Sequence, residues 1–251
     1  MDGGDRAPVA TLQASEPLAA GRAQTLGEEG AHHLRVVRAS LGDAIALRDG
    51  YGGIAVGTLV KLARGTAVVD VEEVERVDAP PAVHLLAPIA DRDRMLWLAE
   101  KASELALTSW RPVLWRRSKS VSPRGEGPMF QQKLRARMMS ALLQSQGAWI
   151  PETFPDATVE RAVAAAPGGT RLLLDVDGAP ILSVSMQEPV SIAVGPEGGI
   201  EDREKEIFLG EGFVAVSIGA TRLRFETAAI AALSIARAAL AYNHQPAARS
   251  Q

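Results

Sequence analysis

The chain has 251 residues, 47% of them hydrophobic, which is enough for one large domain or two small domains with packed cores. It contains no cysteine, which excludes disulfides, thiolate catalysis and cysteine-ligated zinc and agrees with a cytoplasmic location. The formal net charge of −3 excludes a strong attraction between the whole surface and nucleic acid.

One stretch departs from this charge balance. Between Arg111 and Arg137, eight residues are basic and one, Glu126, is acidic. Such a density of positive charge predicts a local patch that can bind a phosphate backbone whatever the net charge.

No part of the sequence predicts a membrane partner. The chain does not open with the basic and apolar residues of a secretory leader. The longest apolar helix that we expect, residues 228–242, is shorter than a membrane span and contains Arg237.

The first eighty residues predict an all-β domain. Residues 1–8 should fray, and residues 28–38 suggest a short helix that runs into an extended segment. Strands are expected at 44–48, 54–62 and 66–77, with Asp49-Gly50 and Arg64-Gly65 in the turns between them. Short strands joined by tight turns are typical of a small barrel.

A metal site is not expected in this domain. His32 and His33 are adjacent, so their side chains point apart, and no cysteine or spaced histidine stands nearby to complete a ligand set.

The sequence changes character at Ala79-Pro80-Pro81, which we take as the boundary between domains 1–79 and 80–251. Beyond it, strands and helices alternate, which predicts an α/β domain with a mostly parallel sheet. The expected strands are 83–87, 110–114, 171–175, 190–194 and 214–218, and the expected helices are 91–107, 128–146, 158–166 and one that opens at Thr221.

Two glycine-rich loops follow the last two of these strands. The first loop begins at Val194 and has three glycines in five residues, Gly195 to Gly199, before an acidic helix start. Bare backbone of this kind leaves space for a ligand to approach N–H and C=O groups closely. The second loop begins at Gly219. Two such loops at the carboxyl ends of neighbouring strands predict a ligand crevice, and the alternative is two ordinary connections.

Charged residues near these loops suggest further functions, each with a plainer alternative. Arg222, Arg224 and Glu226 stand at the mouth of the second loop, where an arginine could hold a phosphate or an anionic ring oxygen, or where all three could form a surface ion-pair cluster. Arg116, Arg117 and Lys119, near Trp110 and Trp115, could bind RNA, or could form a solvated loop beside core tryptophans.

No common nucleotide or hydrolase motif accounts for the loops. The first loop lacks the spacing of a dinucleotide fingerprint and the lysine of a phosphate loop, and no nucleophile elbow is present.

Four segments together resemble the SPOUT class of methyltransferases and, within it, the RsmE-type enzymes: residues 33–50, 101–105, 194–199 and 219–228. The resemblance implies methylation of N3 of a uridine in small-subunit (16S) ribosomal RNA, with S-adenosylmethionine as the methyl donor. It also implies a homodimer, a trefoil-knotted SPOUT domain at 80–251, and an RNA-binding PUA-like β-barrel at 1–79.

The chain departs from the family pattern at several positions. Ala106 stands where the family often has the glycine of Glu-Leu-Gly, and the family's Glu-Gln-Ser-Gly-Arg run is replaced by residues 143–147, with Leu143, Gln146 and Gly147 changed. Thr221 and Arg222 also differ, since the family usually has an apolar residue at the second of these places.

The loops and the resemblance together assign roles to particular residues. The predicted cofactor-binding residues are Leu174, Asp175, Val194, Gly195, Pro196, Glu197, Gly198, Gly199, Ile218, Gly219, Leu223 and Thr227. Arg224 is predicted to stabilise negative charge on the uracil, and Glu226 or Glu197 to accept the N3 proton. Arg38, Arg116, Arg117 and Lys119 are predicted to contact RNA. No metal is expected.

Two other functions stay open at this point. The chain could be a non-catalytic RNA-binding protein that retains the SPOUT fold, in which case cofactor binding need not persist. It could also be an α/β metabolic enzyme that uses a nucleotide cofactor and has no dependence on RNA.

Overall fold

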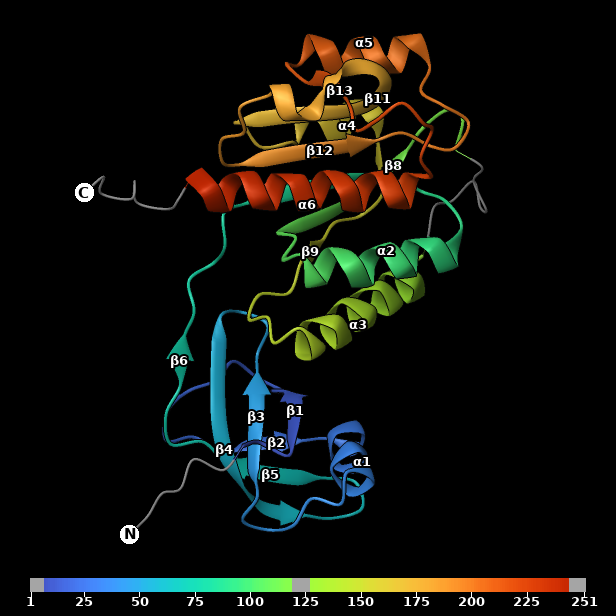
Figure 1. The fold of residues 1–251 in the computed structure, drawn as a ribbon. Coiled ribbons are helices and arrows are strands. Elements are labelled where there is room, and N and C mark those ends of the chain that lie inside the picture. Colours follow the sequence, from blue (N-terminus) through green and yellow to red (C-terminus); the bar gives the residue numbers. More distant parts are fainter. Residues whose placement is uncertain (1–6, 119–126, 244–251) are drawn as a thin grey trace, which may run out of the picture. The chain divides into compact units, whose positions relative to one another are not determined.

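A computed structural model of the chain describes residues 7–118 and 127–243 (Figure 1). The predicted fraying of residues 1–8 falls mainly on residues outside these ranges. The chain divides into two compact units, Met1–Ala79 with Met139–Ile150 and Pro80–Met138 with Pro151–Gln251.

The first unit is a six-stranded, mostly antiparallel sheet with one helix, in the strand order β1-β3-β4-β5-β2 and with β6 paired to β4. Its elements are β1 (Ala10–Gln13), β2 (Gln24–Leu26), α1 (Glu28–Val36), β3 (Ala44–Arg48), β4 (Gly53–Leu62), β5 (Ala67–Asp70) and β6 (Glu75–Arg76). Both predicted hairpins are confirmed, because β3 pairs antiparallel with β4 and β4 with β5. Alternating inward residues of these strands form one buried cluster with Leu34 of α1.

Three expectations for this unit were wrong in detail. The strand expected at 66–77 breaks after Asp70, and only Glu75–Arg76 pairs again, this time with the start of β4. No extended segment follows α1, because Arg38 has a left-handed φ of 58° and turns the chain. The strands β1 and β2 were missed, since each is too short to show a period.

A buried carboxylate fixes the turn between β3 and β4. The side chain of Asp49 is 1% exposed and accepts hydrogen bonds from the backbone N–H groups of Leu18 (3.1 Å), Tyr51 (2.7 Å) and Gly53 (2.9 Å). Arg76 adds an ion pair at 3.2 Å. A Cβ on Gly53 would lie 2.2 Å from the same carboxylate, so only glycine fits there.

The second unit is a seven-stranded sheet whose pairs are all parallel, in the order β10-β8-β7-β12-β11-β13, with β9 paired to β8. Its strands are β7 (Val83–Pro88), β8 (Ser109–Leu114), β9 (Glu152–Thr153), β10 (Ala157–Thr158), β11 (Thr170–Pro180), β12 (Val190–Val194) and β13 (Val214–Ser217). The predicted parallel sheet is therefore confirmed.

The helices of this unit are α2 (Arg92–Glu104), α4 (Val159–Ala164), α5 (Asp202–Gly210) and α6 (Phe225–Asn243), with a short 3-10 turn η1 (Ile181–Ser183). Helix α3 (Pro128–Gln144) begins here, and its residues from Met139 onward group with the first unit. The two-residue strands β9 and β10 were missed, and β11 is longer than the expected 171–175.

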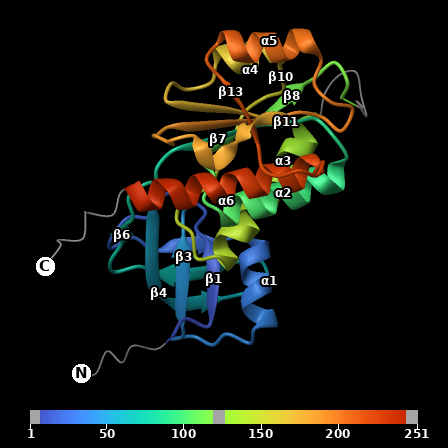
Figure 2. The same cartoon turned by 45° about the horizontal axis from the view of Figure 1, so that its top comes forward.

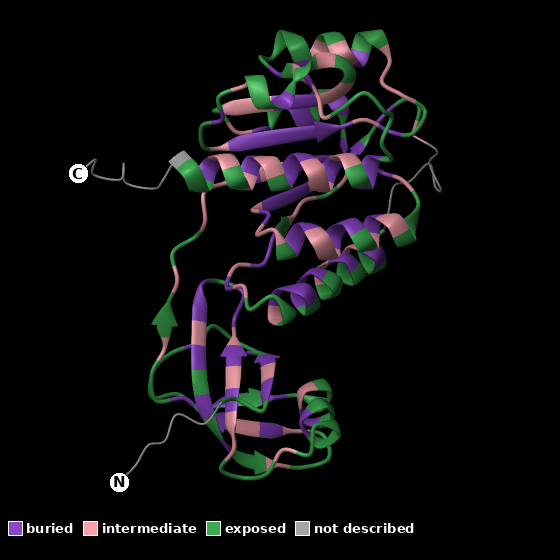
Figure 3. Cartoon of the chain, viewed as in Figure 1, coloured by how far each residue is buried: buried purple, intermediate pink, exposed green. Residues whose placement is uncertain are grey.

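Helices cover both faces of the parallel sheet. Helices α4 and α5 pack on one face through a core that includes Val163, Phe208 and Phe213, and α6 lies on the opposite face with α2 beyond it (Figure 1 and Figure 2). Strand β12 is buried along its whole length (Figure 3), as its apolar sequence requires in the middle of a covered parallel sheet.

Helix α6 is longer than the expected 228–242 and begins at Phe225, so residues 221–224 belong to the preceding loop. By length and a mean hydropathy of 1.3 over Phe225–Tyr242, α6 is the single helix of the described residues that could cross a membrane. Its buried side chains repeat at helical spacing and pack on β7, β12 and α2: Phe225, Ala229, Ala232, Leu233, Ala236 and Leu240.

Arg237 in the middle of α6 ties that helix to the segments beneath it. Its guanidinium donates to the carbonyl oxygens of Pro81, Leu105 and Ala106. Burial lowers the pKa of Arg237 to about 10, so the side chain stays charged at neutral pH. Together with the stripe of buried side chains, these contacts make α6 part of the core of the second unit.

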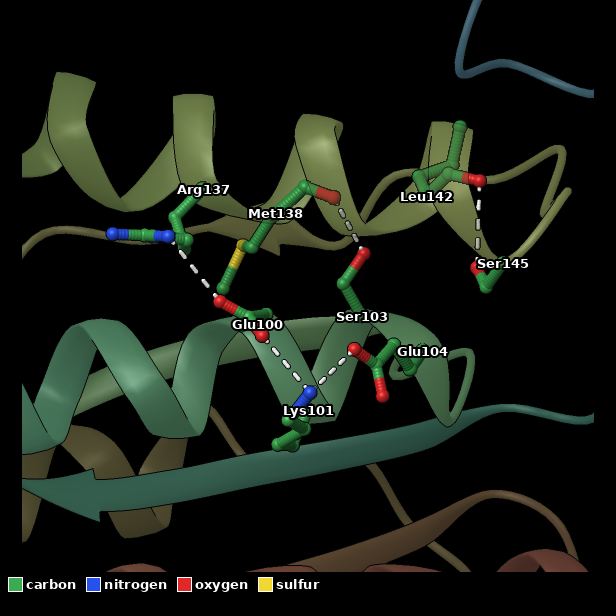
Figure 4. A network of polar contacts seen from close by, with 8 residues as sticks. All are labelled: Glu100, Lys101, Ser103, Glu104, Arg137, Met138, Leu142 and Ser145. Carbon is green, nitrogen blue, oxygen red and sulfur yellow. Dashed lines mark hydrogen bonds and ion pairs between the residues drawn. The ribbon is translucent and has the colours of Figure 1, made fainter. Parts of the chain in front are cut away.

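The segment 101–105, one of those that resemble the family, lies at the end of α2, where polar contacts hold it (Figure 4). Lys101 contacts Glu100 at 2.9 Å and Glu104 at 2.7 Å, and Arg137 of α3 contacts Glu100 at 3.3 Å. Ser103 donates to the carbonyl oxygen of Met138 at 2.8 Å. The contacts of Arg137 and Ser103 join α2 to α3, those of Lys101 lie within α2, and none of these residues lines the cavity described below.

Candidate functional site

A cavity of about 550 Å³ opens in the second unit at the carboxyl ends of β12 and β13, beside the middle of β11. Its size is that of a small-molecule pocket. Eleven of the twelve residues predicted to bind a cofactor line it: Leu174, Asp175, Val194, Gly195, Pro196, Glu197, Gly198, Gly199, Ile218, Gly219 and Leu223. The twelfth, Thr227, lies on α6 and is not part of the lining. The parallel register of β11 with its two neighbours brings both loops to one edge of the sheet.

The first loop is a tight turn that leaves the buried end of β12. The N–H of Gly199 donates to the carbonyl of Pro196 at 2.9 Å, and Gly199 has a left-handed φ of 81°. A Cβ on Gly195 would lie 2.4 Å from Cγ1 of Ile200, and a Cβ on Gly198 would lie 2.9 Å from the carbonyl oxygen of Arg117. A side chain at either glycine would therefore meet atoms of the chain itself, while the backbone of both glycines lines the cavity.

The second loop places two arginines at the cavity. Arg222 and Arg224 both line it and are exposed, and the carbonyl of Arg224 accepts from the N–H of Ala228 at the start of α6. Within the described residues, no ion pair joins Arg224 to Glu226. The alternative of a surface ion-pair cluster at the helix start is therefore not what the structure shows.

Glu226 lies away from the cavity. Its side chain is 8% exposed, and its Oε1 is 3.9 Å from Nε of Arg94, a residue of α2. The other oxygen, Oε2, is buried without a hydrogen-bond partner among the described residues. The same Arg94 forms a close ion pair with Glu197 in the first loop. Of the two carboxylates predicted to accept the proton, Glu197 lines the cavity and Glu226 does not.

Acidic residues of β11 and α5 form another part of the lining, which we call the acidic wall. Asp175, Asp177 and Asp202 line the cavity with Lys205, whose ammonium is 2.5 Å from Asp175. Burial alone would raise the pKa of Asp175, but hydrogen bonds from Lys205 and from the N–H of Asp177 hold that pKa below its ordinary value. The carboxylate is therefore anionic at neutral pH, and Lys205 was not predicted from sequence.

The predicted basic cluster is held partly by the cavity loops. Arg116 and Arg117 approach the carboxylate of Glu201 at 3.8 Å and 3.5 Å, and the N–H of Arg116 donates to Glu204 at 2.7 Å. Arg117 lines the cavity and is 3.5 Å from the carbonyl of Gly198. Arg116 remains 78% exposed at its side chain, so of the pair it is the more available to a partner.

The remaining RNA-contact predictions fall elsewhere. Trp110 and Trp115 are buried, and Trp115 stacks on Phe208 with ring centroids 5.1 Å apart, so these tryptophans belong to the core. Lys119 lies outside the described residues, and Arg38 is exposed in the first unit. In the described ranges no group of three or more His, Asp or Glu side chains could hold a metal ion.

The cavity suits a ligand that has charges of both signs and an edge for backbone hydrogen bonding. Acidic residues of β11 and α5 and arginines of the second loop line it, and the first loop presents backbone rather than side chains. Arg94 and Lys205 were missed because each stands in an ordinary amphipathic helix, and only their partners distinguish them.

Comparisons with known proteins match both units. The family model described as RNA methyltransferase domain matches residues 78–237, and that described as RNA methyltransferase PUA domain matches residues 26–72. Two proteins named ribosomal RNA small subunit methyltransferase E are similar in sequence. The one from Synechocystis is 28% identical over 212 residues, 81% of this chain and 69% of its own length. The one from Mycobacterium tuberculosis is 29% identical over 221 residues, 82% of each chain.

Solved structures agree over nearly the whole chain. A Legionella pneumophila protein described as a methyltransferase, in complex with bound SAM, has a TM-score of 0.85 and 25% identity, covering 93% of this chain and 98% of that one. The ribosomal RNA small subunit methyltransferase E of Neisseria gonorrhoeae, bound to S-adenosyl methionine, has a TM-score of 0.82 and 25% identity, covering 91% and 97%.

Proposed function

The chain belongs to the RNA methyltransferase family, and we propose that it transfers the methyl group of S-adenosylmethionine to N3 of a uridine in small-subunit ribosomal RNA. The cavity at the two glycine loops is the main support, because residues predicted for the cofactor from sequence meet around it. Relatives named small subunit methyltransferases support the substrate, and the resemblance to RsmE-type enzymes supports the N3 position.

The first loop, the middle of β11 and the end of β13 would hold the cofactor. Backbone N–H and C=O groups of Val194–Gly199 would bind its polar edge, and the acidic wall at Asp175 would favour its positive charge. When bound, S-adenosylmethionine supplies an already activated methyl group. The protein then has mainly to align the acceptor nitrogen and exclude water.

Arg224 is the residue we assign to the base. Uracil N3 loses its proton during methylation, so negative charge builds on the two neighbouring carbonyl oxygens of the base. An exposed guanidinium on the cavity wall, with no ion pair to Glu226, can donate to such an oxygen. Glu197 is the carboxylate on the same wall and is our candidate for the proton acceptor.

The substrate must present N3 unpaired. N3 is hidden inside a Watson–Crick pair, so the target uridine must lie in a loop or be flipped out of its stack. The first unit, which matches a PUA domain model, would bind surrounding RNA with Arg38, and Arg116 would contact phosphate from the second unit. We further propose a homodimer in the cytoplasm, as the family resemblance implies.

A methylation assay tests the proposal. Purified protein is incubated with labelled S-adenosylmethionine and either small-subunit RNA or assembled subunits, and the modified base is identified by mass spectrometry. We expect one 3-methyluridine. Tight RNA binding without cofactor binding would instead support a non-catalytic RNA-binding protein, and a modified base other than 3-methyluridine would contradict the N3 assignment. Preference for another nucleotide cofactor would favour a metabolic enzyme.

A further inference from the structure

One guanidinium in the second unit approaches two carboxylates, one in the first glycine loop and one at the head of α6. Arg94 is on the first turn of α2, and its Nη1 forms a close ion pair with Oε1 of Glu197 in the first loop. Its Nε is 3.9 Å from Oε1 of Glu226, the second residue of α6. Arg94 itself does not line the cavity, and of its two partners only Glu197 does.

The start of α2 is well anchored. The N–H of Arg94 donates to the side chain of the N-cap residue Asp91 at 3.1 Å, and Met95, the next residue, is fully buried. The guanidinium therefore extends from a fixed point of the fold. Its partners, by contrast, stand at the tip of a glycine-rich turn and at the end of a loop that contains four exposed residues, 221–224.

Two carboxylates share one guanidinium, and Oε2 of Glu226 is buried with no hydrogen-bond partner in the described chain. A buried carboxylate in this state depends on its cation, because an unpaired charge in a low-dielectric site is costly. Arg94 therefore supplies the positive charge next to Glu226 at the head of α6.

We propose that Arg94 is a positioning residue, which holds the first glycine loop and the head of α6 together through Glu197 and Glu226 and so sets the shape of the cavity. Glu226 acts in this contact as a structural anion and not as a proton acceptor. Where it concerns the cofactor, the inference rests on the proposed function.

The first test uses the ligand-free protein. Amide hydrogen exchange is followed at Gly199, whose N–H closes the first turn, and at Ala228, whose N–H closes the first turn of α6. Arg94→Met should speed exchange about tenfold at both amides, within the range usual for coupling between sites. The matched control is Arg137→Met, which removes one arginine and one exposed ion pair to α2 away from the cavity, and should change neither amide.

Loss of Arg94 leaves Glu226 buried and unpaired, so the variant could unfold for that reason alone. Arg94→Met combined with Glu226→Gln removes this charge and should recover much of the lost stability, while exchange at Gly199 stays fast because Glu197 still lacks its partner. Arg94→Lys retains the positive charge but lacks the planar guanidinium with its several fixed N–H donors. It should recover stability and only part of the protection at Gly199.

The second test measures S-adenosylmethionine by calorimetry on the folded variants. We expect the Kd of the double variant to rise about tenfold and that of Arg137→Met to match the parent protein. Wild-type exchange and wild-type Kd in a folded Arg94→Met protein would overturn the inference. If the parent protein methylates no RNA, the proposed function fails, whereas the exchange result for Arg94 stands or falls independently.

Discussion

At the scale of single residues, the structure separates side chains at the cavity from side chains that only support it. Arg224 and Arg222 are neighbours on the exposed second loop, and both line the cavity. Glu226, two residues after Arg224, is buried behind the wall. The change of direction occurs because α6 begins at Phe225, whose buried ring fixes the helix on the sheet.

Arg224→Ala should reduce turnover on the order of a hundredfold while S-adenosylmethionine binds almost normally, because a donor aimed at developing charge acts mainly in the transition state. Single-turnover kinetics and calorimetry check the two quantities. Arg222→Ala, at the same loop, should have a milder effect. A folded Arg224→Ala protein with wild-type turnover would remove Arg224 from the active site.

Two of the departures from the family pattern are departures in backbone conformation. Ala106 has a φ of 54° and Gln146 a φ of 59°, and these two, with Arg38, are the non-glycine residues of the described chain with positive φ. The family resemblance places glycine at the first two positions. A residue with a Cβ is strained in the left-handed region, so these departures affect stability before they affect the cavity.

Ala106→Gly should therefore raise the free energy of unfolding by up to about 1 kcal/mol, since the relief of strain exceeds the entropy that glycine adds to the unfolded chain. The carbonyl that accepts from Arg237 is retained in this variant. As a control, Ala238→Gly at an exposed position inside α6 should lower the free energy of unfolding by about 1 kcal/mol. Denaturant unfolding measures both. If both variants lost the same free energy of unfolding, the assignment of a strained left-handed backbone to Ala106 would be contradicted.

At the scale of elements, the first glycine loop is held by internal packing. Gly195 faces Ile200, and Gly198 faces the backbone of Arg117, so the turn is a close-packed unit before any ligand enters. Gly219 in the second loop differs, because a Cβ there would meet nothing within 4 Å. Close packing within the chain therefore requires glycine at Gly195 and Gly198, whereas it does not require glycine at Gly219.

Gly195→Ala should weaken S-adenosylmethionine binding at least tenfold and lower thermal stability, because its Cβ would overlap Cγ1 of Ile200. Adding Ile200→Ala should restore part of the stability by removing the overlapping atoms. Gly219→Ala serves as the control and should keep the parent stability. If Gly219→Ala keeps the parent stability but binds S-adenosylmethionine more weakly, the ligand occupies the space beside Gly219. A Gly195→Ala protein with full stability and affinity would contradict the packing argument.

In the first unit, the β3–β4 hairpin depends on one carboxylate. Asp49→Ala would leave three backbone N–H groups without an acceptor and would remove the ion pair to Arg76, so we expect the free energy of unfolding to fall by roughly 3 kcal/mol. Asp70→Ala, at the exposed end of β5, should change stability by less than about 0.5 kcal/mol. Urea unfolding of the whole chain, followed by a probe in the first unit, distinguishes them, and equal stabilities would show that water replaces Asp49.

For the whole molecule, the net charge of −3 means that RNA affinity must come from local contacts. Arg116→Gln should reduce the magnitude of the slope of log Kobs against log salt by about 1, the value for one lost phosphate contact. Arg161→Gln on α4 removes the same charge outside the basic stretch and should leave the slope unchanged. An unchanged slope in a folded Arg116→Gln protein would show that this residue is only solvated.

The sequence by itself determined which loops would meet. Buried strands have near-continuous apolar runs, glycine and proline mark the turns, and parallel strands place their carboxyl ends at one edge. For that reason Asp175, Gly195 and Gly219 could be grouped from sequence, and the structure sets all three around one cavity.

Only the tertiary structure decided what lies behind that cavity. The pairing of Arg94 with Glu197 spans 103 positions, and the contacts of Arg237 span 131 to 156. Such partners are set by how helices pack across a sheet, whereas local propensity and period describe only which face of a helix is apolar. A charged residue on an amphipathic helix has the same local signature whether it meets water or a buried carboxylate. The role of Glu226 therefore followed from the position of α2, and no pattern within residues 219–228 contained it.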